Sequence, residues 1–550
     1  MRTLLIAITT VCICSTTLFA QTDSLDINNI NSGISLHGNM WGTQDSVLIY
    51  SHCEFPKGSQ KQLAAGAAIW MEGTDSAGQL HVAAQAYGQH GYDYWPGPLA
   101  GNDSLTRSIS DLWGRTWKVN RSDVNAFKAI GTHTLLNTPT SVLEWPAKGN
   151  PYAKGTRGNN ISIINDMAPF IDVDGDGRYD PLKGDYPDIK GDQMIWWIFS
   201  DNGPAHNGSN GRPMKMEVHA SAYAYNRVGM LQNIQYYEYN VINKGTNYRN
   251  YRTGVWTDMA LGYPLDNYVG FDSSRRLEYI YNGASFNGTC SYCYGSSIPI
   301  AGISIIQMPG DASLLQPTGS FICYSNDFSP RGNPDVDTEY YNCLNARFRN
   351  GQHLHNDYKG RRTVSNGTGS GPKVNYIFNG DPADTLQWSE CASGNGPGDR
   401  REVIATNDYY FAKYASSKFV FALVVTDRAD RSACPNITLT NIKKITDSAW
   451  YYYYNTPPAT TGIIETANTT GALNLYPNPA NSIINVTRAA SNNNDEESIS
   501  VYDVLGRNIQ VAHTSKKDVI ELNISALQNG VFTIIYRKGN TQLSGVFVKN

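Results

Sequence analysis

The segment that decides the fold is Met214–Tyr225, which reads MKMEVHASAYAY. Apolar or small residues occupy every second position, the period of two that is typical of a β-strand with one buried face. The segments Ile234–Asn243 and Tyr251–Asp258 alternate in a similar way, and Met194–Phe199 is almost wholly apolar. We therefore expect a mainly β, multidomain chain with a β-sandwich-like body.

Further segments extend the predicted sheets, and two helices are expected beside them. A short helix should lie within Asp111–Ile130, with Asp123 near its N-cap, and a second between Asn436 and Tyr454 closes the body. The chain is rich in Tyr, Gly and Asn and only 17% charged, which suits sheets joined by short polar turns. The additional predicted strands are Leu277–Tyr281, Ile300–Gln307, Gly319–Tyr324, Val374–Phe378 and Phe419–Val425.

The N-terminus has the pattern of a signal peptide. Met1-Arg2-Thr3 is a short positive region, and Leu4–Phe19 is mostly apolar or small. Ala20 then precedes a plausible cleavage point at Gln21. No later segment approaches the length of a transmembrane helix. We expect residues 1–20 to be removed, which leaves no transmembrane segment in the mature chain.

Residues 473–550 have the pattern of a small antiparallel β-domain. Short alternating runs are separated by Pro, Gly and Asn, from LYPNPA at Leu475–Ala480 to GVFVKN at Gly545–Asn550. The order of these motifs closely resembles the type A C-terminal sorting domain of the type IX secretion system of Bacteroidetes. The resemblance implies a small antiparallel β-sandwich that the type IX secretion machinery recognises. It also implies a protein that passes through the periplasm and is either secreted or attached to the outer-membrane surface.

The body is similar to a widespread, uncharacterised group of exported Bacteroidetes proteins that carry the same sorting domain. The landmarks span most of residues 50–430 and include WPGPL at Trp95–Leu99, GDYP at Gly184–Pro187 and GDRR at Gly398–Arg401. This resemblance implies architecture and location but no reaction.

The segment Ile171–Asp180, IDVDGDGRYD, carries a motif with definite metal chemistry. Counted from Asp172, carboxylates stand at loop positions 1, 3, 5 and 9, and Gly177 stands at position 6. Ca²⁺ takes roughly six to eight oxygen ligands, which alternating Asp side chains and a backbone carbonyl can supply. Position 12, usually Glu, is Lys183, so Asp185 or Asp188, just beyond it, would supply the missing carboxylate. The candidate ligands are the backbone carbonyl of Arg178 and the carboxylates of Asp172, Asp174, Asp176, Asp180 and Asp185.

This loop resembles the single calcium loops of dockerins and thrombospondin-type repeats, which implies a structural role for the ion. The alternative is an Asp/Gly-rich turn that binds nothing. Closely spaced carboxylates repel one another without a cation, so Ca²⁺ is the expected structural cofactor. A second acidic group, Asp258, Asp266 and Asp272, is expected to consist of surface turn residues.

Cysteine usage fits an oxidising export route. Of nine cysteines, Cys12 and Cys14 fall in the signal peptide, and an odd remainder leaves at least one thiol unpaired. Cys290 and Cys293 lie in a loop-like segment, and no second CxxC or nearby His pair completes a zinc site. A local structural disulfide, or two bridges to distant cysteines, is therefore expected instead of redox chemistry.

Five regions are expected along the chain. Residues 456–472 are rich in Thr, Ala and Pro, the composition of an extended linker. The regions are a signal peptide at 1–20, an N-terminal β-rich region at 21–165, a central β-sandwich-like region at 166–455 that opens with the acidic loop, the linker at 456–472 and the sorting domain at 473–550.

The sequence names no reaction. It lacks Gly-x-Ser-x-Gly, His-Glu-x-x-His, a Walker A loop and a dinucleotide fingerprint, so no catalytic or organic-cofactor residue is assigned. A net charge of −4 without a run of Lys or Arg gives no reason to expect nucleic acid as a partner. Two functions stay open. One is a calcium-stabilised binding, adhesion or structural protein with a glycan or surface ligand. The other is an extracellular hydrolase that acts on polysaccharide or protein.

Overall fold

The computed structural model describes most of the chain outside its N-terminus and a few loops. The predicted signal peptide, residues 1–20, and the predicted linker, residues 456–472, lie outside the described residues. The described residues are 23–44, 49–88, 90–101, 103–227, 229–309, 317–358, 366–426, 434, 437–455, 473, 475–487, 497–503, 508–516, 519–538 and 541–549.

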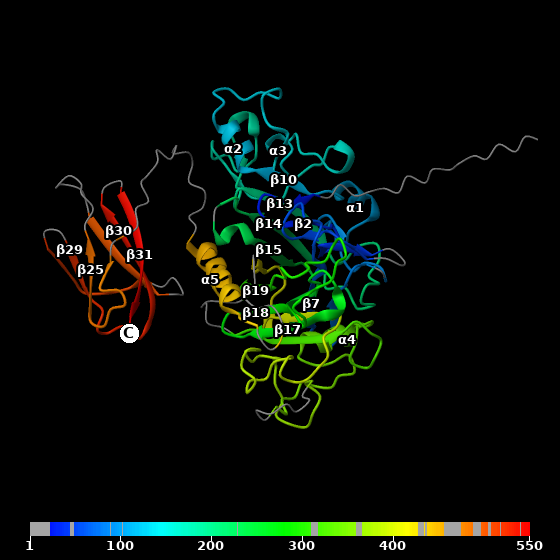
Figure 1. Cartoon of the computed structure of the whole chain (residues 1–550). Helices are drawn as coiled ribbons and strands as arrows, with labels where there is room; N and C mark the ends of the chain where they lie inside the picture. The colour runs from blue at the N-terminus through cyan, green and yellow to red at the C-terminus, as the bar shows by residue number, and fades with distance from the viewer. Residues whose placement is uncertain are drawn as a thin grey trace, which may run out of the picture.

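Two large antiparallel sheets form the body (Figure 1). In the described residues, the first sheet follows the order β1 (Ser24–Leu25), β2 (Asn31–Gly33), β6 (Cys53–Glu54), β7 (Gln62–Thr74), β16 (Tyr248–Met259), β21 (Arg400–Ala405) and β20 (Ser320–Ser325). Three more strands belong to this sheet: β3 (Asn39–Met40) and β8 (Leu80–Ala83) pair with β7, and β22 (Tyr409–Phe411) pairs with β16.

The second sheet contains the segment that opened the sequence analysis. Its order is β10 (Trp117–Asn120), β13 (Gln193–Ser200), β14 (Met216–Ala224), β15 (Ile234–Asn243), β23 (Ser416–Val425), β19 (Ala301–Gln307), β18 (Leu277–Asn282) and β17 (Asn267–Asp272), with β9 (Trp95–Pro96) beside β13. Two small hairpins are separate: β4 (Gly42–Gln44) with β5 (Ile49–Ser51), and β11 (Phe170–Ile171) with β12 (Tyr186–Pro187).

The main core lies between these two sheets. Met216, Val218 and Ala220 of β14 belong to it, whereas Tyr223 packs into a second cluster on the opposite face of the same sheet. Alternate residues of MKMEVHASAYAY therefore point to two different buried faces of the second sheet. One face packs against the first sheet, and helices and loops cover the other.

Helices and loops cover the outer face of the second sheet. Helix α5 (Thr440–Asn455) contributes Ile442 and Ala449 to this second cluster, and the Tyr236 hydroxyl donates to the Ala449 carbonyl at 2.9 Å. Trp113 of α1 (Arg107–Trp113) and Val124 of α2 (Arg121–Lys128) belong to the same cluster, and α3 (Thr140–Leu143) contacts α2 and β10. Helix α4 (Asp337–Leu344) packs against the first sheet. The short 3₁₀ helices are η1 (Thr156–Gly158), η2 (Pro181–Lys183), η3 (Met230–Asn233) and η4 (Pro264–Asp266).

The predicted mainly β fold is confirmed, with local corrections. Val374–Phe378 is not a strand: it lies beside the edge strand β20, where only Tyr376 makes an isolated bridge, to Phe321, and the pairing does not continue along the segment. Asp123, predicted to lie near the N-cap of its helix, is the third residue of α2, and its carboxylate completes a capping box with Asn120. The helix predicted between residues 436 and 454 is confirmed as α5.

The predicted boundary at residue 165 does not separate two sheets. Strand β7 pairs with β16, and β10 pairs with β13, so segments on either side of that position share both sheets. Long-range pairing of this kind follows from sheet register, which neighbouring residues in the sequence do not specify.

The C-terminal residues form a small antiparallel sandwich with its own core, as predicted. Buried side chains that include Ile484, Val501 and Phe547 fill it. One sheet has the order β24 (Leu475–Tyr476), β25 (Ile483–Thr487), β29 (Val519–Asn523) and β28 (His513–Ser515). The other has the order β27 (Asn508–Ile509), β26 (Glu497–Asp503), β30 (Gly530–Lys538) and β31 (Thr541–Lys549).

Two disulfides stabilise loops of the body. Cys290 is bonded to Cys293, which is the first of the two predicted alternatives, and Cys391 is bonded to Cys434. The thiols of Cys53, Cys323 and Cys343 are free and buried. Among the described residues, no helix combines the length and apolar character that crossing a bilayer requires.

Candidate functional site

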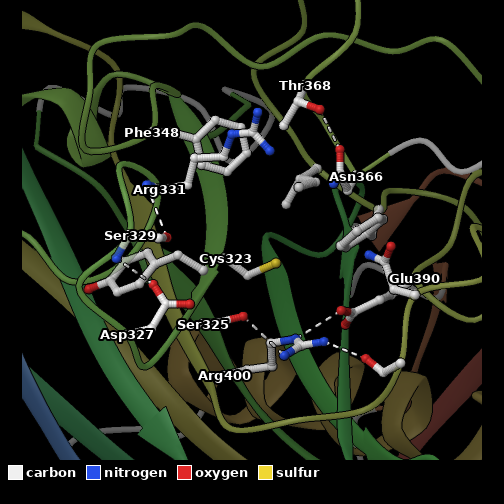
Figure 2. A pocket seen from close by; sticks show the side chains of 15 residues that line it. Cys323, Ser325, Asp327, Ser329, Arg331, Phe348, Asn366, Thr368, Glu390 and Arg400 are labelled. Atoms are coloured by element: carbon white, nitrogen blue, oxygen red, sulfur yellow. Dashed lines mark hydrogen bonds and ion pairs between the residues drawn. The ribbon is translucent and has the colours of Figure 1, made fainter.

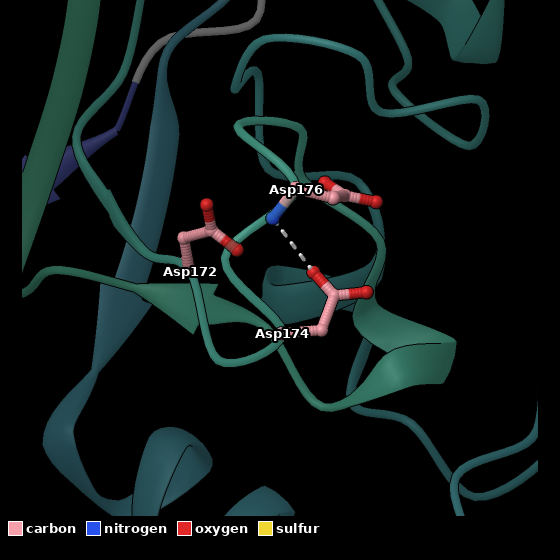
Figure 3. Close-up of side chains that lie close together, drawn as sticks. All are labelled: Asp172, Asp174 and Asp176. Atoms are coloured by element: carbon pink, nitrogen blue, oxygen red, sulfur yellow. Dashed lines mark hydrogen bonds between the residues drawn. The ribbon is translucent and has the colours of Figure 1, made fainter.

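The acidic loop connects β11 to η2 on the surface of the body. One carboxylate oxygen from each of Asp172, Asp174 and Asp176 lies within 4.8 Å of the others (Figure 3). The amides of Gly175 and Gly177 both donate to the Asp172 carboxylate at 2.8 Å. Both glycines have a left-handed φ, near 75°, which lets the loop turn sharply around this carboxylate. The loop therefore gathers three of the predicted ligands by itself.

Lys183 supplies a positive charge to the same cluster. Its Nζ atom lies 3.1 Å from an Asp174 carboxylate oxygen and 2.7 Å from one of Asp176. The hydrogen bond from Lys183 is the main reason that the pKa of Asp176 is lowered. The residue that replaces the usual position-12 glutamate thus neutralises part of the repulsion between the aspartates, and a bound cation would compete with this ammonium group.

Three other predicted ligands hold the loop's backbone. Asp185 is fully buried, and its two carboxylate oxygens accept the amides of Val173 and Asp180, each at 2.8 Å. The Asp180 carboxylate accepts the Leu182 amide at 3.0 Å and so caps η2. The Arg178 amide donates to Asp176 at 2.8 Å. Asp185 therefore joins the two ends of the loop and lies outside the cluster of three aspartates.

Asp185→Asn is expected to destabilise the body by about 2 kcal/mol. An amide group keeps one acceptor oxygen, but its NH₂ group then faces a backbone N–H, which loses its partner in a buried position. Chemical denaturation measures the change. Asp166→Asn is the matched control because that side chain is 91% exposed. An equal loss in both variants would contradict the assigned role.

A polar pocket of about 350 Å³ lies at the edge of the first sheet (Figure 2). Cys323 and Ser325 of β20 and Arg400 of β21 form part of it, and the long connection between these two strands forms the rest. The other lining residues are Tyr324, Asp327, Ser329, Arg331, Phe348, Asn366, Thr368, Ile377, Phe378, Glu390, Asn395 and Gly396.

An ion pair occupies one side of this pocket. Arg400 Nε donates to a Glu390 oxygen at 2.8 Å, and the second Glu390 oxygen accepts the Val269 amide at 2.9 Å. Arg400 also donates to the Gly396 carbonyl at 2.6 Å. Burial raises the pKa of Glu390, and the Arg400 charge opposes that effect. Both charged groups are thus engaged by the protein itself.

The pocket thiol is not poised to react. Cys323 is almost completely buried, and burial raises the pKa of its thiol well above the ordinary value. A thiol, unlike a thiolate, is a weak nucleophile, so the environment of Cys323 does not activate it.

Comparison with known proteins identifies the C-terminal region. Residues 474–550 match the family described as "Secretion system C-terminal sorting domain". The tail is a type IX sorting domain. The protein is therefore exported to the cell surface or secreted, as the sequence implied. No curated protein shows significant similarity to the chain.

Two solved structures show a faint likeness to this exported protein. One is a polysaccharide lyase, 7% identical with a TM-score of 0.17, over 60% of this chain and 34% of the lyase. The other is heparinase III, 5% identical with a TM-score of 0.16, over 64% of this chain and 26% of the heparinase. The chain thus spans about a third or less of either protein, and a likeness this weak defines neither fold nor substrate.

The exported body also contains a carboxyl pair that the sequence did not reveal. Glu278 of β18 and Glu402 of β21 are each 2% exposed, and the Thr257 hydroxyl lies 2.9 Å from an oxygen of both. A hydroxyl has one hydrogen and can donate to only one of them, so the other carboxyl must carry a proton to complete the network. The pair lies in the interior, outside the lining of the pocket.

The second acidic group is not brought together by the fold. Asp258, predicted to be in a surface turn, is buried in β16 and contacts the Arg401 guanidinium at 2.9 Å. The prediction was wrong for this residue because its strand becomes central once β7 and β21 pair on either side. Asp266 accepts hydrogen bonds from Asn282 and Asn287, and Asp272 pairs with Arg275.

Proposed function

We propose that the exported body is a binding protein of the cell surface or the medium, with the polar pocket as its ligand site and the acidic loop as a structural calcium site. The binding role is supported by the pairing of two of the pocket's charged groups, Glu390 and Arg400. These two groups satisfy each other, whereas the remaining lining offers several hydrogen-bonding side chains, among them Ser329, Asn366 and Thr368. Such a lining suits recognition of a polar ligand.

The hydrolase alternative has less support from this pocket. Glycoside hydrolysis generally needs two carboxyl groups that reach the reacting bond from opposite sides. Of the carboxylates among the lining residues, Glu390 is saturated with hydrogen bonds, and Asp327 is exposed and accepts the amide of Ser329. The buried pair Glu278 and Glu402 does not line the pocket.

A panel of glycans and proteins, incubated with the full mature chain, separates the two functions. Retention without product supports binding. Steady release of product that scales with protein concentration would overturn the binding proposal in favour of hydrolysis. Retention of nothing and release of nothing would also count against a binding role for the body.

The calcium part of the proposal rests on the convergence of Asp172, Asp174 and Asp176. Three carboxylates on an exposed loop are hard oxygen ligands of the kind that Ca²⁺ prefers, and water can fill the remaining positions. The ion would pin the connection between β11 and η2, next to the hydrogen bonds that Asp185 makes.

Calcium is expected to raise the melting temperature of the full mature chain after chelation. A ligand that binds only the folded state stabilises it by RT ln(1 + [L]/Kd), about 2.7 kcal/mol when the free concentration is 100 times Kd. A thermal melt in chelator, followed by titration with CaCl₂, measures the shift. The double variant Asp174→Asn/Asp176→Asn should lose it.

Asp166→Asn provides the control, since it removes one exposed carboxylate outside the loop. It should keep the full calcium response. If neither the wild type nor this control responds to millimolar calcium, the calcium proposal is wrong.

A further inference from the structure

Two neighbouring loops beside β17 and β18 carry three exposed aromatic rings. Residues 261–266 lead into β17 and residues 284–297 follow β18, and the adjoining ends of these two strands pair with each other. Tyr263 is 43% exposed, Phe286 54% and Tyr292 43%. Single scattered rings at a surface are ordinary, whereas rings gathered on adjoining loops mark a place where another molecule binds.

The buried side chain of Asn287 ties the two loops together. Its oxygen accepts the amides of Tyr263 at 3.3 Å and Tyr294 at 3.0 Å. Its NH₂ group donates to the Asp266 carboxylate at 3.1 Å. Phe286 directly precedes this residue in the chain, so the backbone on which the first two rings stand is anchored at one point.

The third ring stands on an equally constrained turn. Gln62 of β7 accepts the amide of Gly262 at 2.9 Å and donates its own amide to the Tyr292 carbonyl at 3.1 Å, which links the two loops a second time. The Cys290–Cys293 disulfide closes the turn that carries Tyr292. The backbone beneath all three rings is therefore fixed before a ligand arrives, which lowers the entropic cost of binding.

The exposed aromatic area is too small for a stable protein partner. An aromatic side chain contributes roughly 150–250 Å² when it is covered, so three half-exposed rings offer roughly 300 Å². A stable protein–protein interface generally covers about 800 Å² on each partner. The area fits a small ligand, or a chain that contacts the loops through a few of its units.

The chemistry of the two loops favours an uncharged ligand rich in hydroxyl groups. They contain no Lys or Arg, whereas attraction to an anionic lipid surface relies on clusters of basic residues. Their one carboxylate, Asp266, accepts hydrogen bonds from Asn282 and Asn287. Lys61 lies beside them, with its ammonium group over the Tyr294 ring. The same loops expose small neutral polar residues, among them Ser285, Thr289 and Ser291.

We propose that Tyr263, Phe286 and Tyr292 form a binding site for an uncharged oligosaccharide. A pyranose ring has an apolar C–H face that packs on an exposed aromatic ring, and a rim of hydroxyls that exchanges hydrogen bonds with neutral polar groups. None of the three aromatic residues lines the polar pocket. The site is therefore additional to the proposed ligand pocket and does not depend on it.

The test titrates the full mature chain, with calcium present, with cellohexaose, maltohexaose and xylohexaose, which are uncharged and equal in length. Calorimetry should detect binding of at least one of them. Phe286→Ala and Tyr292→Ala should each weaken that binding about tenfold. Both side chains are exposed, so the variants should melt at the wild-type temperature. Hexagalacturonate, a charged oligomer of the same length, should bind no more tightly than the best uncharged one.

Tyr410→Ala is the matched control, because Tyr410 is 60% exposed and lies in β22, outside both loops. It should bind the oligosaccharide like the wild type. Binding of none of the three uncharged sugars, tighter binding of hexagalacturonate, or unchanged affinity in Phe286→Ala and Tyr292→Ala would overturn the inference. A loss of affinity in Thr368→Ala, a pocket variant, with none in Phe286→Ala would mean that the sugar binds in the pocket. The inference is then wrong while the proposed function stands.

Discussion

Arg401→Met is expected to lower the free energy of unfolding of the body by about 3–5 kcal/mol, because it leaves a buried carboxylate without its partner. Arg401 is 2% exposed, contacts Asp258 at 2.9 Å and also hydrogen-bonds to Asp399. Methionine fills much of the same volume but carries no charge. The Tyr87 hydroxyl, which hydrogen-bonds to Asp258, remains as a much weaker partner.

The variant should also change the pH dependence of stability. Burial raises the pKa of Asp258 to about 6, and the Arg401 charge opposes that effect. Without Arg401 the pKa of Asp258 rises further, so the folded state retains a proton over a wider pH range. The loss of stability that begins as pH rises above the unfolded pKa, near 4, therefore continues to a higher pH than in the wild type.

Urea denaturation at several pH values measures both effects. Arg212→Met serves as the matched control, since the Arg212 side chain is exposed. The double variant Arg401→Met/Asp258→Asn should recover part of the loss, because it removes the unpaired carboxylate. A loss below 1 kcal/mol in Arg401→Met (about the effect of an exposed pair) would show that the contact with Asp258 contributes little to folding.

Glu402→Gln is expected to stabilise the body at pH 8 and to leave its stability at pH 5 nearly unchanged. Burial raises the pKa of Glu402 to about 8, and burial together with the Glu402 charge raises that of Glu278 well above its ordinary value. The folded pair therefore holds protons that the unfolded chain releases above about pH 4.5. The stability that the folded state gains from these protons is complete below about pH 4.5 and is lost as the pH rises through about 8.

The magnitude follows from linkage. Each proton retained only by the folded state costs at most about 1.4 kcal/mol of stability per pH unit, or about 4 kcal/mol between pH 5 and pH 8. Glutamine keeps the shape of the side chain, and its NH₂ group can donate to the Thr257 hydroxyl oxygen without a proton from solvent.

Denaturation curves between pH 5 and pH 8 check this expectation. The free energy of unfolding of the wild type should fall with pH more steeply than that of Glu402→Gln. The difference in slope should be about 1.4 kcal/mol per pH unit, which corresponds to one proton. Glu144→Gln is the control, because its carboxylate is 23% exposed and pairs with Arg115 near the surface. Parallel curves for the wild type and Glu402→Gln would mean that the pair carries no shared proton.

Local chemistry accounts for what the sequence predicted correctly. The alternation of MKMEVHASAYAY specifies a strand because side chains on successive residues point to opposite faces. The order of short strands and turns after Leu475 specified the sorting domain, which the family match to residues 474–550 confirms. The Cys290–Cys293 disulfide and the cluster of Asp172, Asp174 and Asp176 are also local, since their members lie within a few residues of one another.

Only the tertiary structure decided the polar pocket and the buried charges. Arg401 meets Asp258, and Glu402 meets Thr257, because β16 and β21 pair although about 145 residues separate them in the chain. Sheet register determines such contacts, and register depends on how both faces of every strand pack, which no single segment encodes. The sequence thus determined the strands and the export of this protein, whereas long-range strand pairing placed the groups that hold its core and line its pocket.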